Sequence, residues 1–267
     1  MRILIFGAAG FIGSHLTRSL ARAGHEVVAL CRADAIPGFD GACVPWRFGQ
    51  EVPSDAIRGA QAAIHLAHDF HGEPGARTTL SDTLRIMQLL DVSGVQRQLF
   101  FSSYSAGAHA TSIYGRTKYA IEQASAPLHS VVIVRPGLVV GPGGIYGRIE
   151  NWVRRSPIIP LPDGGHGRVP VIRIDRLAHE TLRLIEAPSA VREVNLFEPK
   201  LSSLRELVMA AAPEVQRRRW IVNIPSRVIL VSLKLAAALR IPSPVNSDSL
   251  DGFLANQSAR HTSSLRD

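Results

Sequence analysis

Cysteine is scarce in this chain of 267 residues, which has only Cys31 and Cys43. The two do not form a CxxC pair, so the sequence predicts no disulfide framework, and such sparse use of cysteine is typical of a reducing compartment. We therefore expect a cytoplasmic protein. His65, His68 and His71 lie close together, but no set of carboxylates or thiols completes a coordination shell around them. The sequence therefore predicts no metal site.

Long apolar runs and targeting signals are also lacking. The N-terminus, MRILIFGAAGFIG, is apolar but reaches its first glycine at position 7, which is typical of a first strand rather than a signal peptide. No apolar run reaches the length of a transmembrane helix, so we expect no stable membrane insertion. With 46% hydrophobic and 19% charged residues, the composition is that of a globular protein.

Acidic residues are outnumbered, and the net charge is +8. The surplus fits either a solvated basic surface or a site for an anionic ligand such as a nucleotide phosphate. Nucleic-acid binding is not expected, because no aromatic residues are interleaved with the arginines and no binding motif is present. Arginines gather in the second half of the chain: Arg148, Arg154, Arg155, Arg168, Arg173, Arg176 and the run Arg217, Arg218 and Arg219.

Short β-branched runs alternate with helical patterns along most of the chain. This alternation predicts an α/β fold with a doubly wound parallel sheet covered on both faces. The expected strands are residues 2–6, 26–31, 62–67, 98–103, 130–137 and 192–198, and the expected helices are 11–24, 79–94 and 112–125.

The same pattern suggests two domains. Residues 1–200 are expected to form the dinucleotide-binding domain, from which a segment rich in glycine and proline, about 138–168, extends into a smaller substrate lobe. Residues 201–267 form the rest of that lobe. Its apolar helix at 226–241 predicts a buried helix or an oligomer interface, compatible with a homodimer. Association with a membrane surface is the alternative, disfavoured by the thin polar face of the helix.

Three glycines follow the first strand directly in GAAGFIG. Gly7 permits a tight turn, Gly10 lets the backbone approach a pyrophosphate, and Gly13 lets the helix pack closely on the strand. The N–H groups at the start of that helix, at Phe11 and Ile12, then stabilise the phosphates. This strand–turn–helix context predicts dinucleotide binding in a Rossmann fold, against the alternative of a tight turn without a ligand.

The end of the second strand indicates which dinucleotide binds. NAD-binding proteins place a carboxylate there to accept a hydrogen bond from the ribose 2′-hydroxyl. This chain has Arg32, which can pair with a 2′-phosphate, although Asp34 is close enough to reach a ribose. We therefore favour NADP over NAD.

A serine, a tyrosine and a lysine follow the strand expected at 98–103. Tyr114 and Lys118 are four residues apart and share a helix face, while Ser103 ends the strand. Hydride transfer to a carbonyl must be matched by proton transfer at its oxygen, and a lysine cation lowers the pKa of a nearby phenol. A serine hydroxyl can stabilise charge on the same oxygen. Ser102 is an alternative to Ser103.

Together these segments resemble the extended short-chain dehydrogenase/reductases, the NAD(P)-dependent epimerase/dehydratase/reductase group. The resemblance covers roughly residues 1–200. It rests on GAAGFIG, AAIHLA, FFSS, YGRTK followed by YAIE, VRPGLVVGPGG and IRIDRLA.

The resemblance implies catalytic roles for Ser103, Tyr114 and Lys118, and a small-molecule substrate that is anionic or nucleotide-linked. Tyr104 and Tyr146 are candidates to line the substrate pocket, and Arg168 matches a diphosphate-binding arginine with an offset of one residue. The implied cofactor contacts are Gly7, Gly10, Phe11, Ile12, Gly13, Arg32, Leu66, Ala67, His68, Tyr114, Lys118 and Pro136.

Two departures leave the substrate open. Tyr104 and Ser105 stand where the dehydratases carry an acidic pair, and Tyr114 follows Ser103 after a shorter loop than nucleotide-sugar enzymes have. We expect an oxidoreductase acting on an alcohol/carbonyl pair, either a reductase or an epimerase. The alternative is a non-catalytic dinucleotide-binding redox sensor or accessory subunit.

Overall fold

The structure, a computed structural model, describes residues 1–187, 191–211, 220–239, 247–256 and 262–265. At its centre lies a seven-stranded sheet in which each strand runs parallel to its neighbours. This confirms the predicted doubly wound α/β architecture. In spatial order the strands are β11 (Glu193–Leu196), β6 (Val131–Pro136), β5 (Arg97–Phe101), β4 (Ala62–His65), β1 (Arg2–Phe6), β2 (Glu26–Cys31) and β3 (Ala42–Pro45).

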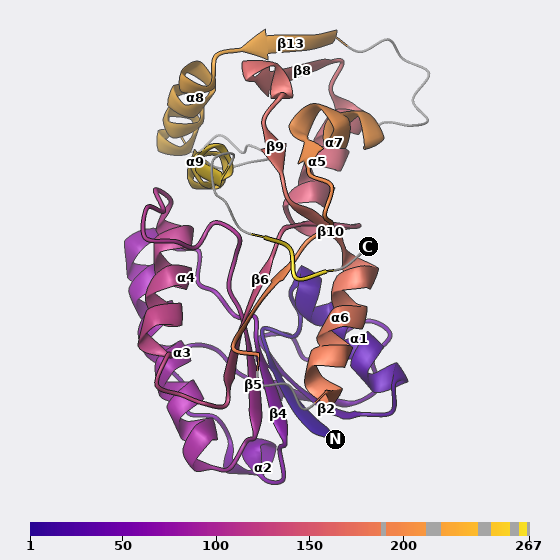
Figure 1. Ribbon diagram of the computed structural model, residues 1–267, viewed down its shortest axis with the longest axis vertical. Coiled ribbons are helices and arrows are strands. Elements are labelled where there is room, and N and C mark those ends of the chain that lie inside the picture. The colour runs from indigo at the N-terminus through magenta and orange to yellow at the C-terminus, as the bar shows by residue number, and fades with distance from the viewer. Residues whose placement is uncertain (188–190, 212–219, 240–246, 257–261, 266–267) are drawn as a thin grey trace.

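Helices cover both faces of the sheet (Figure 1). Leu16 and Leu177 belong to the core on one face, and Ile86 and Leu90 to the core on the other. Burial on both faces explains why the strands are continuous apolar runs rather than alternating patterns. The first face carries α1 (Phe11–Arg22) and α6 (Ile174–Glu186), and the second carries α2 (Ser54–Ile57), α3 (Gly72–Val92) and α4 (Ile113–Ala124).

Helix α3 begins earlier than expected. The sequence predicted a helix from residue 79, after a loop rich in glycine, proline and histidine, but the helix starts at Gly72. Pro74 lies in its first turn, where proline is tolerated because those N–H groups have no partner within the helix. The expected start was therefore wrong, because proline does not exclude the first turn of a helix.

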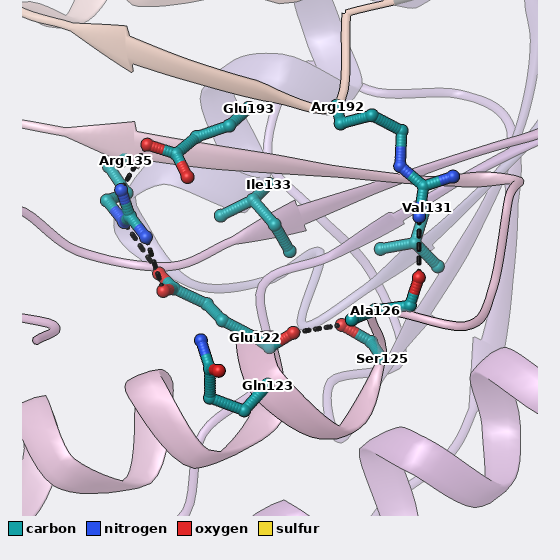
Figure 2. A pocket seen from close by; sticks show the side chains of 9 residues that line it. All are labelled: Glu122, Gln123, Ser125, Ala126, Val131, Ile133, Arg135, Arg192 and Glu193. Carbon is teal, nitrogen blue, oxygen red and sulfur yellow. Dashed lines mark hydrogen bonds and ion pairs between the residues drawn. The ribbon is translucent and has the colours of Figure 1, made fainter. Parts of the chain in front are cut away.

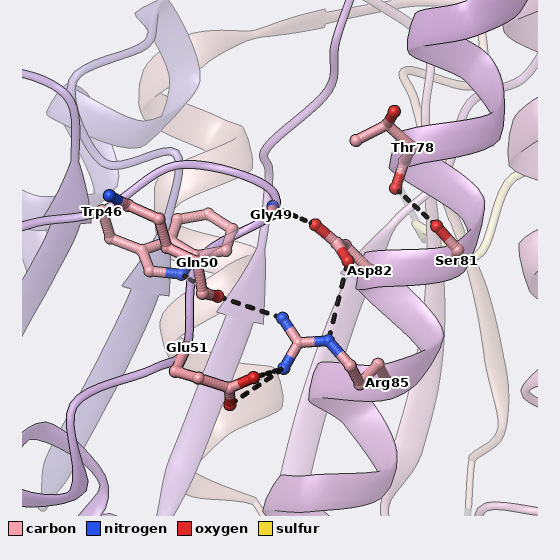
Figure 3. Close-up of polar contacts among 8 residues, drawn as sticks. All are labelled: Trp46, Gly49, Gln50, Glu51, Thr78, Ser81, Asp82 and Arg85. Atoms are coloured by element: carbon pink, nitrogen blue, oxygen red, sulfur yellow. Dashed lines mark hydrogen bonds and ion pairs between the residues drawn. The ribbon is translucent and has the colours of Figure 1, made fainter.

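The segment after β3 is tied to α3 by polar contacts (Figure 3). Arg85 donates to the carbonyl of Gln50 at 3.0 Å and to the carboxylate of Glu51 at 3.2 Å. Asp82 accepts from the backbone N–H of Gly49. These contacts hold the edge of the sheet against the helix layer.

A smaller lobe lies beyond the carboxyl ends of the central strands (Figure 1). The glycine- and proline-rich excursion packs there with the C-terminal segments, because β8 pairs with β13 and β9 pairs with β12. The division into two domains stays a prediction, and the run Arg217–Arg219 lies outside the described residues. The elements are β7 (Leu138–Val140), α5 (Gly144–Arg155), β8 (Ile158–Pro162), the 3-10 turn Asp163–Gly165, β9 (Arg168–Val169), β10 (Val171–Arg173), β12 (Ser202–Ser203), α7 (Leu204–Ala210), β13 (Trp220–Ile224), α8 (Ser226–Ala238) and α9 (Ser247–Asn256).

Candidate functional site

The glycine loop is a close-packed turn between β1 and α1. Gly7 has a φ of 84°, and a Cβ atom there would lie 2.7 Å from the backbone nitrogen of Ala67. A Cβ atom on Gly13 would lie 2.3 Å from the carbonyl oxygen of Gly7. Gly10 precedes the helix and provides no side chain to cap it. The N–H groups of the first turn therefore remain available to a phosphate, and the loop fits the pyrophosphate of a dinucleotide.

The side chain of Phe11 lies against a second glycine-rich segment, which joins β7 to α5. A Cβ atom on Gly143 would lie 2.5 Å from the Phe11 ring, and one on Gly144 would lie 2.8 Å from it. The Phe11 ring therefore has a packing role, and only its backbone N–H is suited to a phosphate. The contact fixes the excursion against the start of α1.

Arg32 follows β2 beside the glycine loop. The N–H of Gly7 donates to the carbonyl of Leu30 at 2.9 Å, which places the end of β2 next to the turn. Arg32 and Asp34 are both exposed, while Cys31 is buried. The structure thus leaves either side chain free to meet the ribose end of a dinucleotide.

Tyr114 and Lys118 lie on one face of α4, next to the carboxyl end of β5. Lys118 is only 2% exposed, and its Nζ donates to the carbonyl of Phe101 at 2.8 Å. The same Nζ lies 5.6 Å from the centre of the Tyr114 ring. Ser103 follows two residues after Phe101, and its hydroxyl lies 2.8 Å from that of Ser105. Tyr114 and Lys118 thus share a helix face beside the end of β5, and Ser103 follows that strand by two residues, while the catalytic roles of the three residues stay predictions.

The pKa of Tyr114 differs from the expectation. Burial raises the pKa of the half-buried Tyr114 phenol to about 12. Burial also lowers the pKa of Lys118 to about 7, and the nearby Glu122 carboxylate only partly offsets this. Loss of hydration is thus the cause of the raised pKa of Tyr114, and the expected lowering by the lysine is not found. Without a cofactor, Tyr114 is a neutral proton donor at neutral pH.

A buried ion pair fixes α4 to the sheet (Figure 2). Glu122, one helical turn beyond Lys118, accepts from Arg135 through Nε at 2.8 Å and through Nη2 at 2.6 Å. Such a two-pronged contact restrains both partners. The hydroxyl of Ser102 also donates to Glu122. Ser102 is therefore committed to this network, and Ser103 is the better candidate for the site.

The start of α4 is held by a residue from the far end of the chain. Asp248 of α9 accepts from the backbone N–H of Ile113 at 2.7 Å and from that of Tyr114 at 3.3 Å. Ser112 caps the same turn, accepting from the N–H of Gly115 at 3.0 Å. Asp248 escaped the sequence analysis because no motif links positions so far apart. Ser112, directly before the helix, was the only local signal.

Aromatic rings surround Tyr114. The ring of His68 meets it edge-on at 4.8 Å, and the ring of Phe70 stacks on it at 5.9 Å. Burial lowers the pKa of His68 to about 3, so this histidine is neutral at neutral pH. Phe70 is 74% exposed, which gives the site an apolar wall that the sequence analysis did not identify.

The other predicted residues lie in different surroundings. Pro136 ends β6, and its carbonyl accepts from the N–H of Tyr104 at 3.2 Å. Tyr104 is buried and meets the ring of Phe197 edge-on at 5.4 Å. Tyr146 is packed into a core cluster of the lobe, and Arg168 is exposed on β9. The structure does not bring Tyr146 or Arg168 into contact with Tyr114, and their substrate roles stay predictions.

The residues that build the glycine loop, the site and the sheet fall within one family match. Residues 3–196 match the NAD dependent epimerase/dehydratase family. The chain belongs to this family. The resemblance expected from the motifs is thereby confirmed, as is the predicted Rossmann fold.

Relatives in the family differ in what they act on. The ceramide reductase of Caulobacter vibrioides is 26% identical and aligns with 97% of this chain and 84% of its own length. The UDP-glucose 4-epimerase of Vibrio cholerae is 25% identical and aligns with 84% of this chain and 78% of its own length. The family and these relatives therefore support an enzyme, without fixing its reaction.

Solved structures share the fold. MoeE5 in complex with UDP-glucuronic acid and NAD has a TM-score of 0.74 at 21% identity, over 84% of this chain and 86% of its own. The NAD-dependent NDP-hexosamine 5,6-dehydratase TunA has a TM-score of 0.70 at 17% identity, over 97% and 98%. Identities this low show the fold alone. In the described ranges, every helix is too short or too polar to serve as a membrane span.

Proposed function

We propose that the protein is an NAD(P)-dependent oxidoreductase acting on an alcohol/carbonyl pair, with Ser103, Tyr114 and Lys118 as its catalytic residues. The observation that carries this proposal is the position of Tyr114 and Lys118 on one face of α4, at the carboxyl end of β5, two strands away from β1 and its glycine loop in the same parallel sheet. A bound nicotinamide supplies or accepts the hydride. The residues of this chain bind the cofactor, orient the substrate oxygen and move its proton.

Each catalytic side chain has a distinct task. The neutral Tyr114 phenol donates its proton to the substrate oxygen as a carbonyl becomes an alcohol. The Ser103 hydroxyl donates a hydrogen bond to that oxygen and stabilises the charge that develops there. Lys118 places a cation beneath the phenol at pH values below its pKa of about 7. In the oxidative direction the same phenol must first lose its proton before it can accept one from the alcohol.

NADP is the favoured cofactor, because exposed Arg32 at the end of β2 suits a 2′-phosphate. The substrate is a small carbonyl compound or a nucleotide sugar. A UDP-glucose 4-epimerase among the relatives supports the second class, and a ceramide reductase supports reduction of a more apolar carbonyl. The aromatic wall of His68 and Phe70 beside Tyr114 favours the apolar class.

Two measurements test the proposal. Mass spectrometry of the purified protein identifies its cofactor: retained NAD(H) indicates an epimerase and exchangeable NADPH a reductase. Tyr114→Phe should then lower turnover by roughly 10²- to 10⁴-fold while leaving cofactor affinity unchanged. Tyr119→Phe, on the same helix, is the matched control and should keep full activity.

Full activity in Tyr114→Phe would rule out the catalytic assignment. Cofactor binding without turnover of any carbonyl substrate would instead favour the alternative, a dinucleotide-binding redox sensor or accessory subunit.

A further inference from the structure

One side of α8 exposes a row of large aliphatic side chains. Val228 is 56% exposed, Val231 is 66% exposed and Leu235 is 59% exposed. Leu239, directly after the helix, is 62% exposed. The spacing of three and four residues puts these side chains on one helix face. Single exposed aliphatic residues are ordinary, but a contiguous row marks an interaction surface.

Two cations lie along one edge of this aliphatic row. Arg227 directly precedes Val228, Lys234 directly precedes Leu235, and both cations are exposed. They are seven residues apart, which places them on the same side of the helix. The sequence from Trp220 to Leu239 contains no aspartate or glutamate. The exposed face of α8 therefore combines aliphatic side chains, the hydroxyl of Ser232 and positive charges, and the helix carries no negatively charged side chain.

A carboxylate does lie at the start of the helix, but it is engaged there. Asp163 accepts from the backbone N–H of Ser226 at 3.1 Å, which satisfies the first turn of α8. On the neighbouring helix α9, Asp248 accepts from the start of α4, and Asp251 is half-buried. None of these carboxylates belongs to α8, whose own charged side chains are all positive.

We propose that α8 binds the surface of an anionic membrane, lying in its plane with the aliphatic row among the lipid chains and Arg227 and Lys234 at the headgroups. A helix of 13 residues is about 20 Å long, which is too short to span a hydrocarbon core of about 30 Å. An apolar face flanked by cations is typical of an interfacial helix, and the exposure of the aliphatic row supports this alternative in spite of the thin polar face noted in the sequence. Figure 1 places α8 at the outer side of the lobe, beside α9.

The charge of the α8 face favours an anionic membrane over a second copy of the chain as the partner. A two-fold interface must be complementary to itself, so a cation buried within it needs an acid on the same patch. The described residues of α8 offer none. Anionic headgroups, in contrast, are complementary to both cations, and each Lys or Arg near such a surface contributes to binding.

Sedimentation with lipid vesicles tests the proposal. The full chain should sediment with vesicles of phosphatidylcholine and phosphatidylglycerol, and at least several-fold less with phosphatidylcholine alone. Arg227→Gln combined with Lys234→Gln should lower the partition coefficient about tenfold or more. Val231→Ser combined with Leu235→Ser should lower it on both kinds of vesicle.

A matched control is Val92→Ser, which changes an 83%-exposed valine at the end of α3 and should leave vesicle binding unchanged. Equal binding to both kinds of vesicle, or none, would overturn the proposal. So would a dimer in analytical ultracentrifugation that dissociates in the Val231→Ser, Leu235→Ser variant, because the face would then belong to a second copy. None of these results depends on the catalytic assignment.

Discussion

Aliphatic side chains are used in opposite ways in the central sheet and on helix α8 of the lobe. Ile3 and Ile5 of β1 are fully buried, whereas Val231 and Leu235 of α8 are more than half exposed. In the sheet, burial of apolar surface drives folding directly, at about 25 cal/mol per Å². On α8 the same residue types leave apolar surface in water. The comparison indicates that the half of the molecule that contains the central sheet buries its aliphatic residues for stability, and that α8 keeps its aliphatic face free for a partner.

The two halves meet at α4. Its inner contacts belong to the sheet half, through Lys118 and the pair of Glu122 and Arg135. Its first turn belongs to the lobe, through Asp248. The comparison can therefore be tested by changes on either side of this helix and in the glycine loop.

The first effect is a loss of stability in the glycine loop. Gly13→Ala should lower the free energy of unfolding by about 3 kcal/mol, because the new Cβ meets the backbone of Gly7 and Ala8, which cannot move aside easily. Gly24→Ala is the control: its φ of 86° is strained for alanine, yet no atom lies within 4 Å, so we expect about 1 kcal/mol. Urea unfolding measures both. Equal losses would mean that close packing at Gly13 is unimportant.

The second effect concerns the pH dependence of stability that comes from the buried side chain of Lys118, beside the central sheet. The pKa of Lys118 is lowered to about 7 in the folded chain, against 10.5 for an ordinary lysine. Between these values the unfolded chain binds more protons, so stability rises with pH by up to about 1.4 kcal/mol per pH unit from this group. Lys118→Met should remove that rise between pH 7 and 10. Unfolding curves of both proteins at several pH values give the difference, and parallel pH dependences would contradict the assignment.

The strands, the glycine loop and α4 could be predicted from the sequence because each depends on residues that are close together in the chain. The turn at Gly7, the buried run of β1 and the shared face of Tyr114 and Lys118 each follow from neighbouring residues. The raised pKa of Tyr114 was not predictable, because it depends on burial by distant segments rather than on the lysine four residues away. Asp248 was missed for the same reason: its partners lie more than a hundred residues earlier.

The third effect is a loss of activity caused by a change in the lobe, at the contact between Asp248 and α4. It depends on the proposed function. Asp248→Asn keeps an oxygen acceptor but removes the negative charge at the positive end of α4, worth about 1 kcal/mol. We expect kcat to fall about fivefold, because Tyr114 is less firmly placed, while the Kd for the cofactor stays unchanged. Asp163→Asn is the matched control, because Asp163 makes the same kind of contact at the start of α8. A similar loss in both variants would indicate general destabilisation of the lobe.

The smallest effect is expected on cofactor affinity, at Arg32 after β2. Arg32 is exposed after β2, so its pairing with a 2′-phosphate is screened by water and contributes about 1 kcal/mol or less. Arg32→Ala should therefore weaken NADP binding several-fold and leave NAD binding unchanged, as titration calorimetry with each cofactor would measure. Asp34→Asn separates the alternatives, since loss of NAD affinity there would assign the ribose hydroxyls to Asp34. Unchanged NADP affinity in Arg32→Ala would contradict the expected preference, and the basic residue after β2 would then be part of the solvated surface.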